Sequence, residues 1–194
     1  MVRISVQLID AQNDQHLWSE NFDRRLTNML GVQGEIALQV ANKLNVKPNI
    51  GIRIKQQWGA LDCAILNAGG CEYLEASQFE AAMLERMMRA NLFSAAYCIE
   101  TALPLLRKGH SPHLVAVGSS VTFAALPRAE AYGASKAALR YLMETLRIDL
   151  ASEGIAVTLV SPGFVDTPMT AQNDFPMPFR WSVERAAREI ELGH

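Results

Sequence analysis

Three short apolar runs, each followed by a turn that contains glycine, limit the folds open to this chain. They span residues 61–66, 114–117 and 155–160, and each has the length and composition of a buried β-strand. Two longer segments between them, 79–106 and 131–150, carry apolar residues at the spacing of an α-helix. Strands that alternate with helices build a parallel sheet, so we expect an α/β fold in which residues 61–66 form a strand buried on both faces.

The polar and small residues that follow these runs indicate where a binding site belongs. In a parallel sheet the carboxyl ends of the strands share one edge, and ligands bind beyond that edge. Asn67 and Gly69 follow the first run, Ser119 follows the second, and Pro162 follows the third. The sequence therefore predicts that these four residues lie together at one edge of the sheet.

Tyr132 and Lys136 stand four positions apart at the start of the helix predicted after the second run. Side chains at this spacing share one face of a helix. A free tyrosine has a pKa of about 10, too high for a base at neutral pH, and a neighbouring ammonium lowers that pKa because the cation favours the phenolate. The pair is thus a candidate for proton transfer, although tyrosine and lysine also occur at this spacing on ordinary helix surfaces.

Five motifs follow one another along the chain from about Trp58 onward. A run that ends in Asn-Ala-Gly is followed by an asparagine in a helical segment, a Gly-Ser-Ser turn, a Tyr-Gly-Ala-Ser-Lys segment and a Ser-Pro-Gly turn. They are residues 61–69, Asn91 with Leu92, 118–120, 132–138 and 161–168. With these motifs the chain resembles the later half of the short-chain dehydrogenase/reductase family, which implies a partial Rossmann-like parallel sheet with flanking helices.

The resemblance implies NAD(P)-dependent hydride transfer between nicotinamide and an alcohol or carbonyl substrate. It makes Tyr132 the general acid or base, and Lys136 both its pKa partner and a ligand of the nicotinamide ribose. Ser119 would hydrogen-bond the substrate oxygen, and Asn91 would hold a water that links Lys136 to solvent. Ser120 is a rival for the serine role, but Ser119 has the better spacing to Tyr132 and lies just after the strand.

The same resemblance implies a cofactor site at the edge of the sheet. Glycine after the first run permits close approach of the backbone to a ribose, and the Ser-Pro-Gly turn would border the nicotinamide. The cofactor is NAD or NADP, and the quoted motifs do not select between the two. The residues expected to bind it are Asn67, Ala68, Gly69, Tyr132, Lys136, Pro162, Gly163, Val165 and Thr167.

One part of the family pattern is missing from these 194 residues. Members of the family open with a strand, a Gly-rich turn and a helix that hold the cofactor pyrophosphate, whereas this chain has 12 glycines and no Gly-x-Gly. We therefore expect a truncated or fused relative that binds NAD or NADP weakly. The alternative is a catalytically silent protein that keeps the fold for oligomerisation or interaction.

The beginning of the chain follows a different pattern. Alternation of apolar and polar residues predicts a β-hairpin over 2–23, and an apolar stripe predicts a helix over 27–44. This stretch resembles a small module of bacterial cyclase-like and tetratricopeptide-repeat proteins. We expect a hairpin and helix module at 1–47, a junction at 48–57 and a dehydrogenase-like part at 58–194.

Composition and charge limit the partners and the metals. The formal net charge is −2, which gives no electrostatic case for nucleic acid or an anionic membrane. We find no apolar run near the ~20 residues of a membrane span and expect no signal peptide. Three cysteines without metal-ligand spacing predict no metal site and favour the reducing cytoplasm. By resemblance we expect a small alcohol or carbonyl substrate and a homo-dimer or homo-tetramer.

Overall fold

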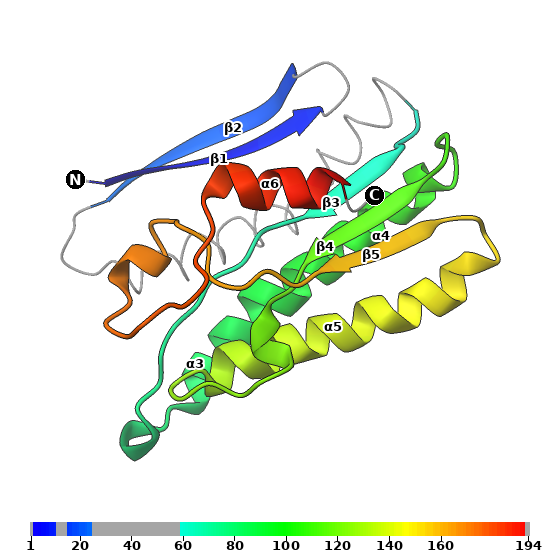
Figure 1. Ribbon diagram of the computed structural model, residues 1–194. Coiled ribbons are helices and arrows are strands. Elements are labelled where there is room, and N and C mark those ends of the chain that lie inside the picture. Colours follow the sequence, from blue (N-terminus) through cyan, green and yellow to red (C-terminus); the bar gives the residue numbers. More distant parts are fainter. Residues whose placement is uncertain (1, 11–14, 25–58, 193–194) are drawn as a thin grey trace.

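The computed structural model describes residues 2–10, 15–24 and 59–192 (Figure 1). The predicted hairpin is confirmed, since β1 (Val2–Asp10) pairs with β2 (Gln15–Arg24) in an antiparallel sheet of two strands. The helix predicted over 27–44 and the junction at 48–57 lie outside the described residues.

A second sheet carries the predicted parallel strands. β3 (Cys63–Leu66), β4 (His113–Val117) and β5 (Ala156–Val160) lie in the order β3-β4-β5, and both pairings are parallel. The predicted α/β class with a parallel sheet is therefore confirmed. β3 begins two residues later than expected, because the Leu61 N–H donates to the Leu105 carbonyl at 3.1 Å instead of to a neighbouring strand.

Helices follow each strand of this sheet. After β3 the chain forms consecutive helical segments, α3 (Ala81–Met88), a π-helical turn at Arg89–Phe93 and α4 (Ser94–Leu106). α5 (Glu130–Ala151) follows β4, and α6 (Val183–Leu192) comes after β5. Short 3-10 helices lie in the connecting loops at Ala76–Gln78, Ser120–Thr122 and Thr170–Gln172. Within the described ranges no helix combines the length and the apolar character that crossing a membrane requires.

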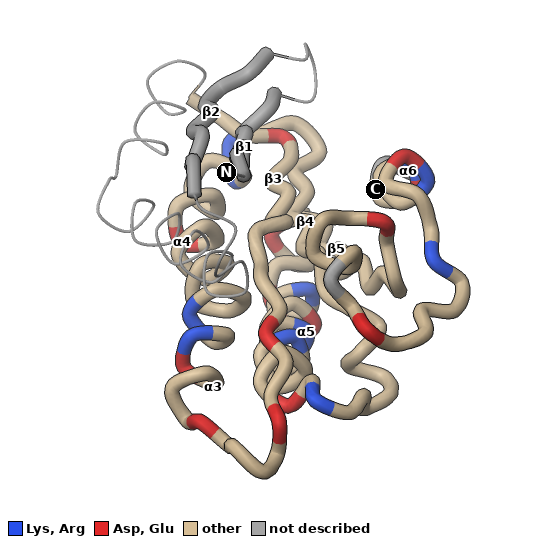
Figure 2. Tube along the Cα trace, turned by 90° about the vertical axis from the view of Figure 1, so that its left-hand side faces the viewer, with Lys and Arg blue, Asp and Glu red and all other residues tan. Residues whose placement is uncertain are grey.

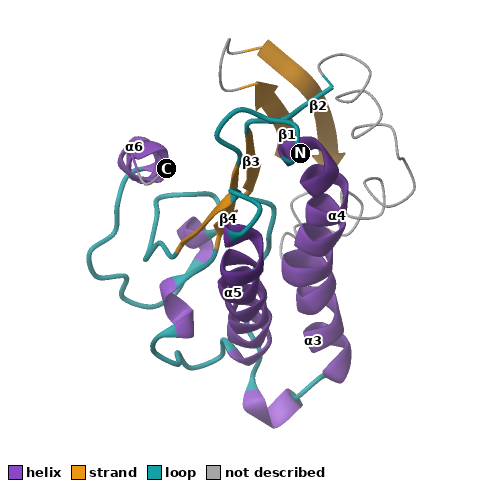
Figure 3. Cartoon of the chain, turned by 90° about the vertical axis from the view of Figure 1, so that its right-hand side faces the viewer, coloured by secondary structure: helices purple, strands orange, loops and turns teal. Residues whose placement is uncertain are grey.

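Two helices support the sheet from one side. α4 and α5 cover one face of the sheet, and α6 lies on the other side (Figures 2 and 3). Leu114, Ala116 and Val157 of the strands are buried in a core with Leu139 and Met143 of α5. A fully buried leucine, valine or methionine contributes about 1.5–3 kcal/mol, so the edge that carries the site motifs rests on a packed apolar layer.

The opposite face of β3 differs from the sequence-based expectation. Ile65 keeps 45% of its surface exposed, and it shares this face with Val115 and Thr158, which are aligned with it across the sheet. Among the described residues β3 pairs only with β4, and β1 and β2 form a sheet of their own. The prediction that residues 61–66 form a strand buried on both faces is therefore wrong, because a continuous apolar run does not by itself provide two covering layers.

Candidate active site

The serine and tyrosine motifs meet where β4 ends and α5 begins. The Ser119 hydroxyl caps the short helix Ser120–Thr122 by accepting a backbone N–H at 3.3 Å. Tyr132 and Lys136 lie in the first two turns of α5. The Lys136 ammonium donates to the Val117 carbonyl at 2.9 Å, so it joins the start of α5 to the last residue of β4.

The side chains of Tyr132 and Ser119 lie close enough to interact, which brings together the predicted proton donor and the predicted substrate-binding serine. Burial raises the pKa of Tyr132 to about 12; the interaction with Ser119 opposes this shift, and nearby Cys71 adds to it. The rival Ser120 is exposed, and its N–H donates to the Pro162 carbonyl at 2.9 Å. Both serines line the cavity described below, and the choice of Ser119 for the serine role stays a prediction.

The expected lowering of the Tyr132 pKa by Lys136 is wrong for this structure. Burial of the phenol is the largest influence on its pKa, and it acts in the opposite direction. Burial also lowers the pKa of Lys136 to about 8, because only 5% of its surface is exposed. The four-residue spacing showed that the two side chains share a helix face, but it did not show how far both are removed from water.

Asn91 is fully buried in the π-helical turn between α3 and α4. Its amide oxygen accepts the Gly70 N–H at 2.8 Å, and its amide nitrogen donates to the Gly70 carbonyl at 3.0 Å and to the Ser135 hydroxyl at 2.8 Å. Ser135 donates in turn to the Tyr132 carbonyl at 2.7 Å. One amide therefore links the turn after β3 to the part of α5 that carries Tyr132. Its role in holding a water stays a prediction.

Gly69 packs closely against Asn91 and Lys136. A Cβ atom on Gly69 would lie 2.9 Å from Oδ1 of Asn91 and 3.3 Å from Nζ of Lys136. Because glycine has no Cβ, the turn after β3 can approach these side chains closely. Gly70 differs from its neighbour, since a Cβ on Gly70 would meet no heavy atom within 4 Å.

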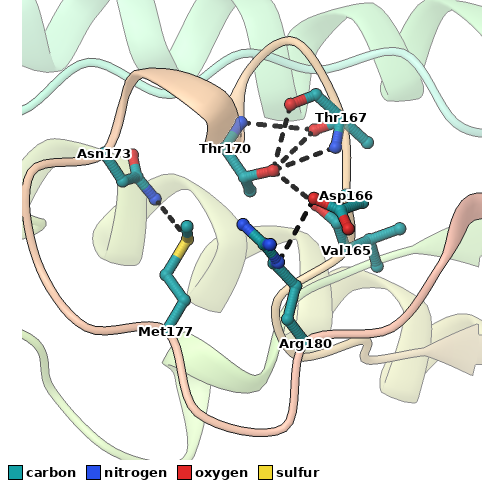
Figure 4. Close-up of polar contacts among 7 residues, drawn as sticks. All are labelled: Val165, Asp166, Thr167, Thr170, Asn173, Met177 and Arg180. Atoms are coloured by element: carbon teal, nitrogen blue, oxygen red, sulfur yellow. Dashed lines mark hydrogen bonds and ion pairs between the residues drawn. The ribbon is translucent and has the colours of Figure 1, made fainter.

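The loop that follows β5 is held by its own hydrogen bonds (Figure 4). Val165 and Trp181 form an isolated parallel bridge that joins the two ends of the loop. Inside the loop, the Thr167 N–H donates to the Thr170 hydroxyl at 3.0 Å, and the hydroxyls of the two threonines lie 3.3 Å apart. These contacts fix Val165 and Thr167, two of the predicted cofactor-binding residues, beside the end of β5.

The segments after the three strands line one cavity of about 1980 Å³. Two of the predicted site residues, Ala68 and Asn91, are not part of its lining. The predicted residues that line it are Asn67, Gly69, Ser119, Tyr132, Lys136, Pro162, Gly163, Val165 and Thr167. The expectation that the strand-end residues lie together is met by this cavity, and their roles stay predictions.

Sequence reasoning gave no role to Cys71, Tyr73 or Ser135. Cys71 and Tyr73 also line the cavity, and each influences the pKa of the other. Burial raises the pKa of both side chains, that of the Cys71 thiol to about 11. Cys71 and Tyr73 could have been noticed in the sequence because they closely follow the Asn-Ala-Gly turn. Ser135 could have been noticed because it stands beside Lys136 within the Tyr-Gly-Ala-Ser-Lys segment. In the part of the chain that the structure describes, no three His, Cys, Asp or Glu side chains are grouped to hold a metal ion.

The parallel sheet, and the order in which the serine, tyrosine and lysine follow one another along the chain, correspond to one known family. A family model described as short chain dehydrogenase matches residues 26–176, which is more than half of the chain and includes all four predicted catalytic residues. The chain belongs to the short-chain dehydrogenase family.

Individual relatives agree with this family. An uncharacterized oxidoreductase of Myxococcus xanthus is 39% identical over 135 residues, which are 70% of this chain and 53% of the relative. Another, of Staphylococcus epidermidis, is 30% identical over 156 residues, which are 79% of this chain and 68% of the relative. The solved structure of Pseudomonas aeruginosa RhlG in an NADP active-site complex is 28% identical, with a TM-score of 0.62, and the match covers 70% of this chain and 53% of that chain.

The matches set limits on what the family assignment covers. The chain spans about half the length of the Myxococcus xanthus relative and of RhlG. The matched segment begins at residue 26, upstream of the quoted motifs. The resemblance of residues 1–45 to the cyclase-like module stays a prediction, as do the three domain boundaries.

We expect Gly69→Ala to disturb the site and Gly70→Ala to leave it intact. The methyl group added in the first variant meets Asn91 and Lys136, whereas the methyl group of the second meets open space. Overpacking of this kind costs roughly 1–3 kcal/mol of the free energy of unfolding, which urea denaturation measures. An equal loss in the two variants would contradict the close packing around Gly69.

The lowered pKa of Lys136 predicts a stability that rises with pH above about 8. An unfolded lysine titrates at about 10.4, whereas burial brings the folded Lys136 to about 8. Between these values the unfolded state binds more protons, so the free energy of unfolding increases with pH. Below about pH 8 both states hold the proton, and the cost of burying the charge is fully present.

The comparison protein for this effect is Lys136→Met, which lacks the titrating amine. Relative to this variant, we expect the wild-type free energy of unfolding to rise by about 2 kcal/mol between about pH 8 and about pH 10. Urea unfolding of both proteins measures the difference, and an NMR titration of the Lys136 amine gives its pKa without a variant. A difference that stays constant over this range would show that Lys136 keeps an ordinary pKa.

Proposed function

We propose that this chain carries the catalytic half of an NAD(P)-dependent oxidoreductase that transfers a hydride between nicotinamide and an alcohol or carbonyl carbon. The observation that carries the proposal is that Tyr132, Ser119 and Lys136 line one cavity, with Tyr132 and Ser119 close enough to interact. Family membership implies these side chains as the acid or base, the substrate anchor and the cation. The oxidoreductase names of the relatives and the NADP in the RhlG complex support the same activity.

Tyr132 supplies the proton in the direction of carbonyl reduction. With a pKa of about 12, its phenol is protonated at neutral pH, which suits it to act as an acid. As the carbonyl carbon gains a hydride, the π electrons of C=O move to oxygen, and that oxygen takes the proton from Tyr132. Ser119 donates a second hydrogen bond to the same oxygen. Oxidation of an alcohol reverses each step, with Tyr132 as the base.

Lys136 provides a buried positive charge beside this proton donor. An ammonium has three N–H donors, and one of them is used by the Val117 carbonyl. The others are available for a ribose hydroxyl.

The turns after β3 and β5 fit the nicotinamide half of the cofactor, which supplies or takes up the hydride when it is bound. Gly69 leaves its turn without a side chain where the backbone approaches Lys136. The loop after β5 lines the other side of the proposed position through Pro162, Gly163 and Thr167. The choice of NAD or NADP is left open, because none of these contacts involves the ribose position in which the two differ.

We expect the 194-residue chain to bind NADH and NADPH weakly, because it contains no Gly-x-Gly. Each backbone hydrogen bond to a charged pyrophosphate is worth about 1.5–3 kcal/mol. Without three or four of them the dissociation constant should be about millimolar or beyond detection, since about 1.4 kcal/mol corresponds to a factor of ten. Titration of the purified chain, followed by nucleotide fluorescence, measures this constant. A value in the low micromolar range would show that the missing contacts are supplied elsewhere.

At millimolar cofactor we expect Tyr132→Phe to abolish turnover and Tyr141→Phe to leave it unchanged. The first variant removes the proton donor, a loss of about 10²–10⁴-fold, and the second removes a hydroxyl from a side chain of α5 that is 75% exposed. Lys136→Ala should lower both the rate and the cofactor affinity. The absorbance of NADPH at millimolar concentration, with a panel of ketones, follows the reaction.

The outcomes of this experiment separate the proposal from its alternative. Turnover that survives Tyr132→Phe would remove Tyr132 from the mechanism. A wild-type chain that binds cofactor but shows no turnover with any ketone would favour the catalytically silent protein.

A further inference from the structure

Three aromatic side chains form one border of the cavity. Tyr73, Phe164 and Phe175, here called the aromatic wall, all line it. The rings of Tyr73 and Phe175 meet edge to face, with centroids 5.6 Å apart and planes at 87°, and the centroids of Phe164 and Phe175 are 6.1 Å apart. The three residues come from different segments, after β3, just after β5 and before α6. Such contacts hold aromatic rings in a defined geometry.

The aromatic wall begins beside the predicted catalytic residues. The Cys71 thiol lies close enough to Tyr73, Tyr132 and Lys136 to influence the pKa of all three. Tyr132 also influences the pKa of Tyr73 directly. Tyr132 and Ser119 line the same cavity as the aromatic wall, so a substrate whose oxygen meets these two residues shares that cavity with the wall.

The hydroxyl of Tyr73, which is the polar group of the aromatic wall, already has a hydrogen-bond partner in the protein. The Tyr73 hydroxyl donates to Oδ1 of Asn173 at 2.8 Å, and the Asn173 amide donates to the Met177 sulfur at 3.2 Å. Residues 100 positions apart in the sequence are thereby joined. The wall is held in place without a ligand, and it offers ring surface rather than a hydroxyl group.

The charged group nearest to the wall is also neutralised. Arg128 lies over the Tyr73 ring at 5.5 Å, with ion-pair distances of 2.7 Å to Glu75 and 3.2 Å to Asp174. The other charged residues of the lining are Lys136, beside Tyr132, and Glu184 and Arg188, which are exposed on α6. An anionic substituent against the wall would lose its hydration beside Arg128, whose charge Glu75 and Asp174 already balance, and this is unfavourable.

We propose that the cavity takes an uncharged ketone or alcohol whose reacting carbon carries an aromatic or bulky apolar group, and that the aromatic wall binds this group. The reacting part of the ligand rests on the proposed function. Burial of an aromatic substituent there removes apolar surface from water and adds edge-to-face contacts. For such a ketone, a hydride from the nicotinamide cofactor and the proton of Tyr132 would convert C=O into CH–OH.

Acetophenone and pyruvate are suitable probes, because both are small methyl ketones. Acetophenone carries an uncharged aromatic ring on the reacting carbon, whereas pyruvate carries a charged carboxylate there. Their binding to the full chain is measured by ligand-observed NMR, with and without millimolar NADPH. We expect the dissociation constant of acetophenone to be about ten-fold or more below that of pyruvate. This measurement does not require turnover.

Phe175→Ala and Phe179→Ala form a matched pair within one loop. Phe175 belongs to the aromatic wall, whereas Phe179 is 92% exposed and is not part of the cavity lining. We expect Phe175→Ala to weaken acetophenone binding about ten-fold and Phe179→Ala to leave it unchanged. Phe175→Leu, which keeps the apolar bulk, should weaken binding about three-fold and serves if the alanine variant does not fold.

The proposal is overturned if pyruvate binds as tightly as acetophenone, if neither ketone binds, or if the Phe175 and Phe179 variants bind acetophenone equally. NADPH oxidation, followed in parallel, tests the proposed function separately. Acetophenone binding that depends on Phe175 without turnover supports the aromatic wall and counts against the activity. Turnover of acetophenone that Phe175→Ala does not change supports the activity and overturns the aromatic wall.

Discussion

The geometry of the site depends on one buried amide, that of Asn91. It pairs with both backbone groups of Gly70 and with the Ser135 hydroxyl, so the turn after β3, the π-helical turn and α5 are fixed relative to one another. A buried polar group left without a partner costs about 1–3 kcal/mol. A shift of any one of these segments would incur this cost, and it would also move the backbone that carries Tyr132.

Three titratable groups share this frame, the buried Cys71 and Lys136 and the partly buried Tyr132, and desolvation is the largest influence on the pKa of each. The pKa values of about 11 for Cys71 and about 12 for Tyr132 keep both groups neutral at pH 7, while Lys136, with a pKa of about 8, is mostly charged. This part of the cavity therefore holds a single positive charge among neutral donors. A fixed positive charge in water-poor surroundings favours negative charge that develops on a substrate oxygen.

Local patterns in the sequence were sufficient for the sheet and for much of the cavity. Apolar runs followed by turns predicted the parallel strands, and position after a strand placed Ser119 beside Tyr132. The direction of the Tyr132 pKa shift was not predictable in this way, because desolvation depends on every segment that surrounds the phenol. The contact between Tyr73 and Asn173 spans 100 positions and leaves no periodic signal, so the aromatic wall could be found only in three dimensions.

Tyr73 connects the aromatic wall to the chemistry of the site. Its hydroxyl contacts Asn173 in the loop before α6 and Cys71 beside Tyr132. Desolvation is already the largest influence on the pKa of Tyr73, Cys71 and Tyr132. An apolar group against the aromatic wall excludes more water and so acts in the same direction on the phenol. In the proposed reaction, binding of an apolar substrate would therefore favour the protonated form of Tyr132, which is the form that would donate a proton to a carbonyl oxygen.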